Sequence, residues 1–151
     1  MSVSPFTFRE ATAADMPGIA RVRFSVRENI LTPEQLRERG ITNESVAASF
    51  LTTSKGWVAE RDGEIVAFAI ADRESRSLFA LFVLPKHERQ GLGSRLLTTS
   101  LDWLRANGAT EVWLTTGPDT TAARFYERRG WIDTGTDATG DLRYEFTIAA
   151  V

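Results

Sequence analysis

The sequence predicts an α/β fold in which about four helices cover a mixed β-sheet of about seven strands. Apolar runs and alternating apolar-polar segments of strand length recur along the chain, with helical patterns between them. Two of the helical segments each lie between strands, and such a connection joins parallel neighbours in a sheet. The 151 residues are an ordinary size for one domain, so residues 1–151 are predicted to form a single domain.

The N-terminal part is predicted to begin with a strand and a long helix. Residues 6–10 alternate apolar and polar side chains, as a half-buried strand does. Thr12 and Asp15 have the spacing of a capping box, which predicts a first helix that continues to Val26. A second helix is predicted from the cap and first-turn proline at Thr32 and Pro33.

The next segments give a short helix, a hairpin and an apolar strand. Residues 44–51 have a helical pattern, and the pair Asp62-Gly63 between two apolar runs predicts a hairpin of residues 57–61 and 64–72. Residues 77–84 are apolar almost throughout, which is typical of a strand buried on both faces.

The C-terminal part is predicted to alternate helices and strands. A leucine stripe follows a glycine-containing loop and predicts a helix that ends at Gly108. Residues 111–115 form the next predicted strand, and either Asp119 or Thr120 caps a helix that Gly130 ends. Two last strands are predicted over residues 131–136 and 142–148.

Composition excludes several classes of function. The net charge is −2 and no block of five like charges occurs, which disfavours a nucleic acid as partner. The chain has no cysteine and a single histidine, His87, so neither disulfides nor a metal site are expected. No apolar run has the length of a membrane span, and the first ten residues lack the pattern of a signal peptide. The sequence therefore predicts a cytoplasmic protein without a membrane partner.

The stretch from Val83 to Leu97 carries the strongest chemical signal. It leads from an apolar strand into a helix through a loop that contains Gly91 and Gly93. Free amides and the positive end of the helix dipole make such a helix start an anion site, and glycine lets the backbone approach a phosphate closely. The dinucleotide fingerprint fails because Leu96 occupies the third glycine position, and the P-loop fails because Ser94-Arg95 replaces Lys-Ser/Thr.

This stretch resembles motif A of the GCN5-related N-acetyltransferases (GNAT family), in which loop amides hold the coenzyme A pyrophosphate. Glu88 stands at the usual Arg/Gln position, and the positive charge follows at Arg89. The resemblance implies that the preceding strand pairs with the pantetheine arm. The coenzyme-binding residues that it implies here are Leu81, Phe82, Val83, Glu88, Arg89, Gln90, Gly91, Leu92, Gly93 and Ser94.

A second stretch, Asp119 to Trp131, resembles motif B of the same family. Phe125, Tyr126 and Gly130 stand at matching positions, whereas Asp119 replaces the usual Asn. The residues alone predict that Phe125 faces the core and that Tyr126 lies between core and water. The resemblance adds Asp119 and Tyr126 to the coenzyme site and makes Tyr126 the general acid that protonates the departing thiolate.

The resemblance implies a mostly antiparallel sheet whose parallel pair is splayed at the acetyl-CoA site. It implies transfer of an acetyl group from acetyl-CoA to a primary amine, by direct attack in a ternary complex and without a metal. The acceptor is a small-molecule or peptide amine that the sequence does not identify. Homodimers are common in the family, which makes a homodimer a further expectation.

The sequence gives weaker evidence for the residues that bind and deprotonate the acceptor amine. Glu28 is a candidate general base, with Asp72 and Glu74 as other candidates, and Asp72 is also a candidate for contact with the acceptor. The resemblance places the acceptor pocket near residues 25–29, where Arg27 and Asn29, together with Arg23, suit a polar or acidic acceptor. The alternative function is a non-catalytic acyl-CoA-binding module of the same fold.

Overall fold

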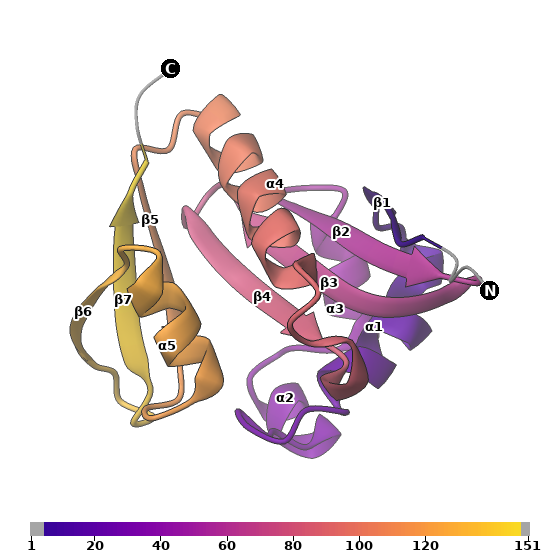
Figure 1. The fold of residues 1–151 in the computed structure, drawn as a ribbon, viewed down its shortest axis with the longest axis horizontal. Coiled ribbons are helices and arrows are strands. Elements are labelled where there is room, and N and C mark those ends of the chain that lie inside the picture. Colours follow the sequence, from indigo (N-terminus) through magenta and orange to yellow (C-terminus); the bar gives the residue numbers. More distant parts are fainter. Residues whose placement is uncertain (1–4, 149–151) are drawn as a thin grey trace.

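The computed structural model describes residues 5–148 and contains a seven-stranded mixed sheet of order β1-β2-β3-β4-β5-β7-β6 (Figure 1). Every neighbouring pair is antiparallel except β4 and β5, which confirms the mixed, mostly antiparallel sheet. The signal-peptide expectation rests partly on residues 1–4, which lie outside the described residues. The strands are Thr7–Glu10 (β1), Ser54–Arg61 (β2), Glu64–Asp72 (β3), Ser77–Val83 (β4), Glu111–Thr116 (β5), Ile132–Thr136 (β6) and Leu142–Thr147 (β7).

Residues 5–148 contain five α-helices, one for each helical segment that was predicted along the chain. In Figure 1, α4 crosses one face of the strands β2 to β4, and α1 lies on the other face. The predicted leucine stripe of α4 is buried at Leu92, Leu96, Leu97 and Leu104. The helices are Met16–Arg23 (α1), Pro33–Glu38 (α2), Asn43–Ser49 (α3), Leu92–Ala106 (α4) and Thr121–Arg128 (α5).

The parallel pair β4 and β5 is splayed. The two strands pair only at Ser77 and Trp113, near the beginning of β4, and then separate. Trp113 strengthens this junction, since its backbone N–H donates to Arg76 O (3.2 Å) and its Nε1 donates to Ser75 O (2.9 Å). Beyond the junction, β5 pairs with β7 and β4 pairs with β3, so a gap in the ladder separates the two halves of the sheet.

The apolar strand β4 is not buried on both faces, and that prediction was wrong. Ser77 and Leu78 are buried, but Phe79 is 47% exposed and residues 80–83 are half-buried. The reason is the divergence of β5, which leaves the second half of β4 without a neighbour on one edge. The apolar side chains of residues 80–83 pack against the core and also line a cavity.

The first helix ends at Arg23 and not at Val26 as predicted. Phe24 already leaves helical geometry (φ −91°, ψ 2°), and the Ser25 hydroxyl donates to Val22 O (2.6 Å). A serine that bonds the backbone in this way competes with helix continuation. Residues 24–31 consequently form a loop, so Arg27, Glu28 and Asn29 lie on this loop and not on a helix face.

Asp15 joins β1 to the start of α1. Its carboxylate accepts two hydrogen bonds from Arg9 (2.8 Å each) and one from the Thr12 N–H (2.7 Å), the contact expected of a capping box. The Arg9 hydrogen bonds are the main cause that lowers the pKa of Asp15 to about 2. Because the folded pKa lies below the unfolded value of about 4, this stabilisation is complete above pH 4 and is lost as the pH falls toward 2.

Asp15→Asn is therefore expected to lower the free energy of unfolding by about 1.5–3 kcal/mol at pH 7, because it removes charge-assisted hydrogen bonds. Urea denaturation at pH 7, 4 and 2.5 measures the difference from the wild type, which should shrink below pH 4. Glu64→Gln is the control, since the Arg21–Glu64 pair is exposed on both sides. A difference that stays constant down to pH 2.5 would contradict this role.

Candidate functional site

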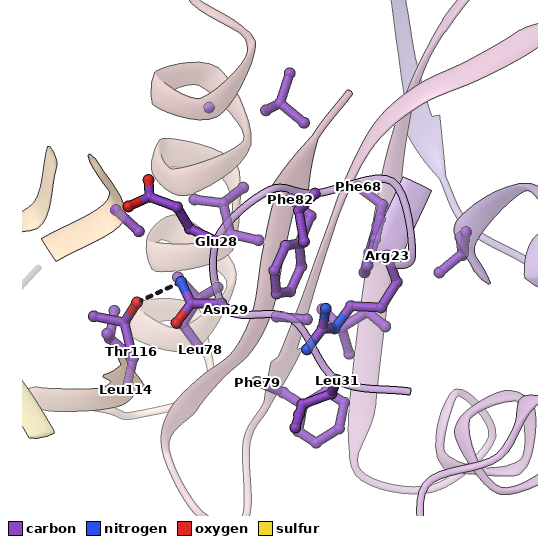
Figure 2. Close-up of a pocket in the computed structure, with 18 of the residues that line it drawn as sticks. Arg23, Glu28, Asn29, Leu31, Phe68, Leu78, Phe79, Phe82, Leu114 and Thr116 are labelled. Atoms are coloured by element: carbon purple, nitrogen blue, oxygen red, sulfur yellow. Dashed lines mark hydrogen bonds between the residues drawn. The ribbon is translucent and has the colours of Figure 1, made fainter. Parts of the chain in front are cut away.

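A cavity of about 1710 Å³ opens where β4 and β5 separate. Its lining comes from the strands β3, β4 and β5, from α1 and the segment that continues through α2 into α3, from the loop before α4 with the first turn of that helix, from α5, and from the β6–β7 turn. Figure 2 shows the wall that β4 and the loop 24–31 form. The cavity thus brings together residues of both sequence motifs and the loop 24–31, which carries Arg27, Glu28 and Asn29.

β4 supplies one wall of the cavity through Leu81, Phe82 and Val83, the three predicted pantetheine-binding residues. Within the described residues, the edge of β4 that faces β5 has no ladder partner after Ser77. Such an edge presents backbone N–H and C=O groups to an extended ligand, in the way a sheet edge binds a peptide strand. The wall can therefore bind a ligand that carries amide groups of its own.

The loop before α4 has the backbone geometry of an anion site. Gly91 is the N-cap of this 15-residue helix at φ 81°, and nothing lies within 4 Å of a Cβ built on it. Arg89 also has positive φ (64°), so the loop turns sharply ahead of the helix. The first-turn amides of Leu92, Gly93 and Ser94 have no intrahelical acceptor and, as the positive end of the helix dipole, suit a phosphate group.

Arg129 connects this loop to α5. Its Nη2 donates to the Ser94 hydroxyl, and its guanidinium lies 3.6 Å from the centroid of the Phe125 ring. Arg129 is not among the residues that the sequence predicted for the site. The contact joins residues 35 positions apart and carries no local sequence signal. It adds a positive charge beside the first turn of α4.

The structure brings most of the predicted coenzyme residues together. Glu88 and Arg89 line the cavity, whereas Gln90 and Asp119 are not among its lining residues. Asp119 has positive φ (55°) and precedes the helix cap. Thr120 is that cap, because its hydroxyl oxygen accepts from the Ala123 N–H (3.1 Å), which decides between the two predicted caps of α5.

Tyr126 is a buried residue of the cavity lining. It is 5% exposed and packs edge-on against Phe125 and Trp131, with ring centroids 5.2 and 5.4 Å away. Burial raises the pKa of the phenol, and the charge of Arg129 opposes this only in part. The phenol therefore stays protonated at neutral pH and is available as a proton donor.

The prediction that Phe125 is more deeply buried than Tyr126 was wrong. Phe125 is half-buried and lines the cavity, whereas Tyr126 is buried. Both side chains line the cavity, and Phe125 packs against the core without being fully covered by it.

Asn29 fastens the loop 24–31 to the end of β5 (Figure 2). Its Nδ2 donates to Thr116 Oγ1 (3.0 Å), and its Oδ1 accepts from the Gly117 N–H (2.7 Å). A Cβ at Gly117 would lie 2.7 Å from Asn29 Oδ1, so this close approach requires glycine. Asn29 lines the cavity, but its amide is engaged in holding the loop.

Of the predicted carboxylates Glu28, Asp72 and Glu74, only Glu28 lines the cavity. Glu28 lines the cavity, and its Oε1 accepts from the Thr121 N–H (3.0 Å), a hydrogen bond that lowers the pKa of Glu28. Asp72 lies outside the cavity lining, at the β3–β4 turn. There it accepts from the Thr53 and Ser75 hydroxyls (2.6 Å each). Arg27 lines the cavity as an exposed residue of the loop.

Asp141 is a cavity residue that sequence reasoning missed. It lies in the β6–β7 turn, where an acidic residue is ordinary and carries no signal of function. Its carboxyl is half-buried, and burial together with the nearby charge of Asp137 raises its pKa, while Arg39 opposes the shift. Asp141 therefore faces the cavity as a carboxylate that is more basic than an ordinary aspartate.

The described residues contain no group of three or more His, Cys, Asp or Glu side chains placed to hold a metal ion. None of the helices within residues 5–148 is long and apolar enough to cross a membrane. A cytoplasmic location and homodimer formation stay predictions.

Comparison with known proteins identifies the family. Residues 21–131 match the family described as "Acetyltransferase (GNAT) family". Human N-acetyltransferase 8 is 39% identical over 88 residues, which cover 52% of this chain and 39% of that protein. The peptidyl-lysine N-acetyltransferase YiaC of Escherichia coli (strain K12) is 38% identical over 52 residues, covering 34% of this chain and 35% of that protein. The chain thus spans less than half the length of these two relatives.

Solved structures share the whole fold. The PaiA N-acetyltransferase of Thermoplasma acidophilum, in complex with coenzyme A, superposes with a TM-score of 0.80 at 17% identity, covering 95% of this chain and 99% of that one. The ribosomal-protein-S18-alanine N-acetyltransferase of Escherichia coli superposes with a TM-score of 0.72 at 19% identity, covering 97% of this chain and 96% of that one. At these identities the similarity concerns the fold alone. Since the family match includes β4, the α4 loop and Tyr126, the chain belongs to the GNAT acetyltransferase family.

Proposed function

We propose that this protein is an acetyl-CoA-dependent N-acetyltransferase that transfers the acetyl group to a primary amine by direct attack in a ternary complex. The observation that carries the proposal is the cavity between β4 and β5. It places the free edge of β4, the first turn of α4 and the buried phenol of Tyr126 around one space.

The coenzyme fits two parts of this space. The first-turn amides of Leu92, Gly93 and Ser94 suit its pyrophosphate, and Arg89 and Arg129 add positive charge nearby. The amide groups of the pantetheine arm suit the unpaired edge of β4 over residues 81–83. A structural relative of the same fold was crystallised with coenzyme A, which supports this placement.

The transfer requires one proton to be supplied and one removed. The amine nitrogen forms a bond to the thioester carbonyl carbon, and the carbon–sulfur bond then breaks. A backbone N–H of residues 81–83 stabilises the carbonyl oxygen as it gains negative charge. Tyr126 gives its phenolic proton to the departing sulfur, and the nitrogen loses its extra proton to a base or through water.

Glu28 and Asp141 are the two candidates for this base. The pKa of Glu28 is lowered and that of Asp141 is raised, so the surroundings make Asp141 a better proton acceptor than an ordinary aspartate and Glu28 a poorer one than an ordinary glutamate. We expect Asp141→Asn to lower kcat/KM by about 10- to 100-fold at pH 7 and Glu28→Gln to lower it less than about threefold. The Asp141→Asn deficit should shrink toward pH 10, where the amine is already neutral. Equal losses in both variants, constant with pH, would contradict this assignment.

An amine screen tests the proposed function. The purified protein is incubated with acetyl-CoA and amines of different classes: polyamines, amino acids, aminoglycosides and lysine peptides. Thiol release is followed, and mass spectrometry checks each product for one added acetyl group. Acetylation of at least one class above the uncatalysed rate is the expected result. Tight binding of acetyl-CoA with no acetylated amine would favour the alternative, a non-catalytic acyl-CoA-binding module.

A further inference from the structure

Arg23, the last residue of α1, presents an unpaired cation to the cavity. Its guanidinium lies over the ring of Phe82, 4.3 Å from the centroid, and is half-buried. Its Nη1 is buried and has no hydrogen-bond partner among the described residues, and no carboxylate of residues 5–148 lies within ion-pair distance of it. Burial, with a contribution from Arg39, lowers the pKa of Arg23.

A cation in this position needs an anion. Removing a guanidinium from water is costly unless a partner carries the opposite charge and accepts its hydrogen bonds. Other arginines of the described chain meet this need within the protein: Arg9 pairs with Asp15, and Arg21 pairs with Glu64. One face of the Arg23 guanidinium is covered by Phe82, so the planar edge with its N–H groups is what remains for a partner.

Arg23 lies on the opposite side of β4 from the α4 loop. Side chains alternate along a strand, and Val83 points toward α4, since its Cγ2 lies 4.0 Å from a Cβ built on Gly93. Phe82 therefore points the other way, toward α1, where it stacks on Phe68 with ring centroids 5.7 Å apart. Figure 2 shows Arg23 beside these two rings, with Leu31 of the loop nearby. The phosphate groups of a coenzyme at the α4 loop would lie on the other side of the strand.

We infer that Arg23 forms an anion subsite for the acceptor, so that the preferred acceptor is an amine that also carries a carboxylate. This inference rests on the proposed function and adds the chemical class of the substrate. A carboxylate matches the planar fork of a guanidinium through two parallel hydrogen bonds. The aromatic surroundings of Phe68, Phe79 and Phe82 favour this compact anion over a more strongly hydrated phosphate.

The acidic residues of the same cavity complement this subsite. Glu28, Glu44 and Asp141 line it and can attract the ammonium end of a zwitterionic acceptor. Asp141 and Arg23 both interact with the charge of Arg39, which also lines the cavity. A molecule with an amine and a carboxylate can therefore meet opposite charges at its two ends.

The test compares pairs of amines that differ only in the carboxylate: amino acids of increasing chain length, the corresponding amino amides and the decarboxylated alkylamines. The wild type should prefer the acid over its amide by about 10- to 100-fold in kcat/KM. In Arg23→Gln this preference should fall to about threefold or less. The preference of Arg23→Lys should lie between those of the wild type and Arg23→Gln. The Kd for acetyl-CoA should stay the same in both variants.

Arg61 offers a matched control. It also covers an aromatic ring, Phe6, at 3.6 Å and has a buried nitrogen, Nε, without a partner in the described chain, but it does not line the cavity. Arg61→Gln should leave the preference for the acid unchanged. An aminophosphonate of each chain length is included, and a preference for it over the carboxylate would overturn the inference.

Two further outcomes separate this inference from the proposed function. Binding of N-acetyl amino acids, measured by calorimetry, needs no turnover and should depend on Arg23. If they bind in an Arg23-dependent way but no amine is acetylated, the proposed function fails and the anion subsite stands. Two results would show that the anion subsite is wrong. One is that alkylamines and amino amides are acetylated as well as the amino acids. The other is that Arg23→Gln weakens acetyl-CoA binding while the preference for the amino acid over its amide remains.

Discussion

Replacing Tyr126 with Phe is expected to lower kcat by about 100-fold or more while the Kd for acetyl-CoA changes by less than about twofold. The substitution removes one hydroxyl from a side chain that is 5% exposed and keeps the ring contacts with Phe125 and Trp131. Without the phenolic proton, the thiolate must leave unprotonated or wait for water. Steady-state thiol release gives kcat, and calorimetry gives the Kd.

Tyr144 provides the matched control for this prediction. It is the second of the two tyrosines, is buried and donates a hydrogen bond to Glu127 Oε1 (3.1 Å), but it does not line the cavity. Tyr144→Phe should therefore lower the thermal midpoint slightly and leave kcat unchanged. Equal turnover of Tyr126→Phe and the wild type would remove Tyr126 from the chemistry.

The second large effect is expected at the α4 loop. Gly91→Asp should raise the Kd for acetyl-CoA by about 10- to 100-fold, because it places a negative charge at the start of the helix where the pyrophosphate is proposed to bind. Aspartate tolerates the left-handed backbone better than most residues, and nothing lies within 4 Å of the added Cβ. The fold should therefore persist.

Two variants isolate the effect of charge in this prediction. Gly91→Asn has the same shape without the charge and should raise the Kd less than Gly91→Asp. Gly108 also has positive φ (91°) and open space around it, but it lies beyond the other end of α4. Gly108→Asp should leave acetyl-CoA binding unchanged. The same Kd in Gly91→Asp and Gly108→Asp would show that the anion binds elsewhere.

The sequence was sufficient for features that short-range patterns determine. The Asp62-Gly63 turn, the helix start at Gly91 and the helix end at Gly130 each depend on a few adjacent residues, and the structure has all three. The splayed parallel pair followed from the family resemblance and not from the apolar pattern of β4 itself. That pattern looks the same whether a strand faces the core or an apolar cavity.

Features that depend on distant residues could not be predicted. The first helix stops at Arg23 through a serine bond to its own backbone, and the following loop is then fixed by Asn29 to Gly117, 88 positions away. The contact of Arg129 with Ser94 and the placement of Asp141 likewise follow from the assembled fold. Candidate acceptor residues were therefore the least predictable part of the site.

Calorimetric titration of acetyl-CoA into the purified protein tests the central claim, that the cavity between β4 and β5 is a coenzyme A site. ATP and NADH serve as controls, because both carry phosphates and adenine but lack the pantetheine arm. The expected result is a one-to-one complex with a Kd of about micromolar order for acetyl-CoA and at least about 100-fold weaker binding of the controls. Absence of acetyl-CoA binding, or binding of ATP and NADH with the same affinity, would contradict the claim.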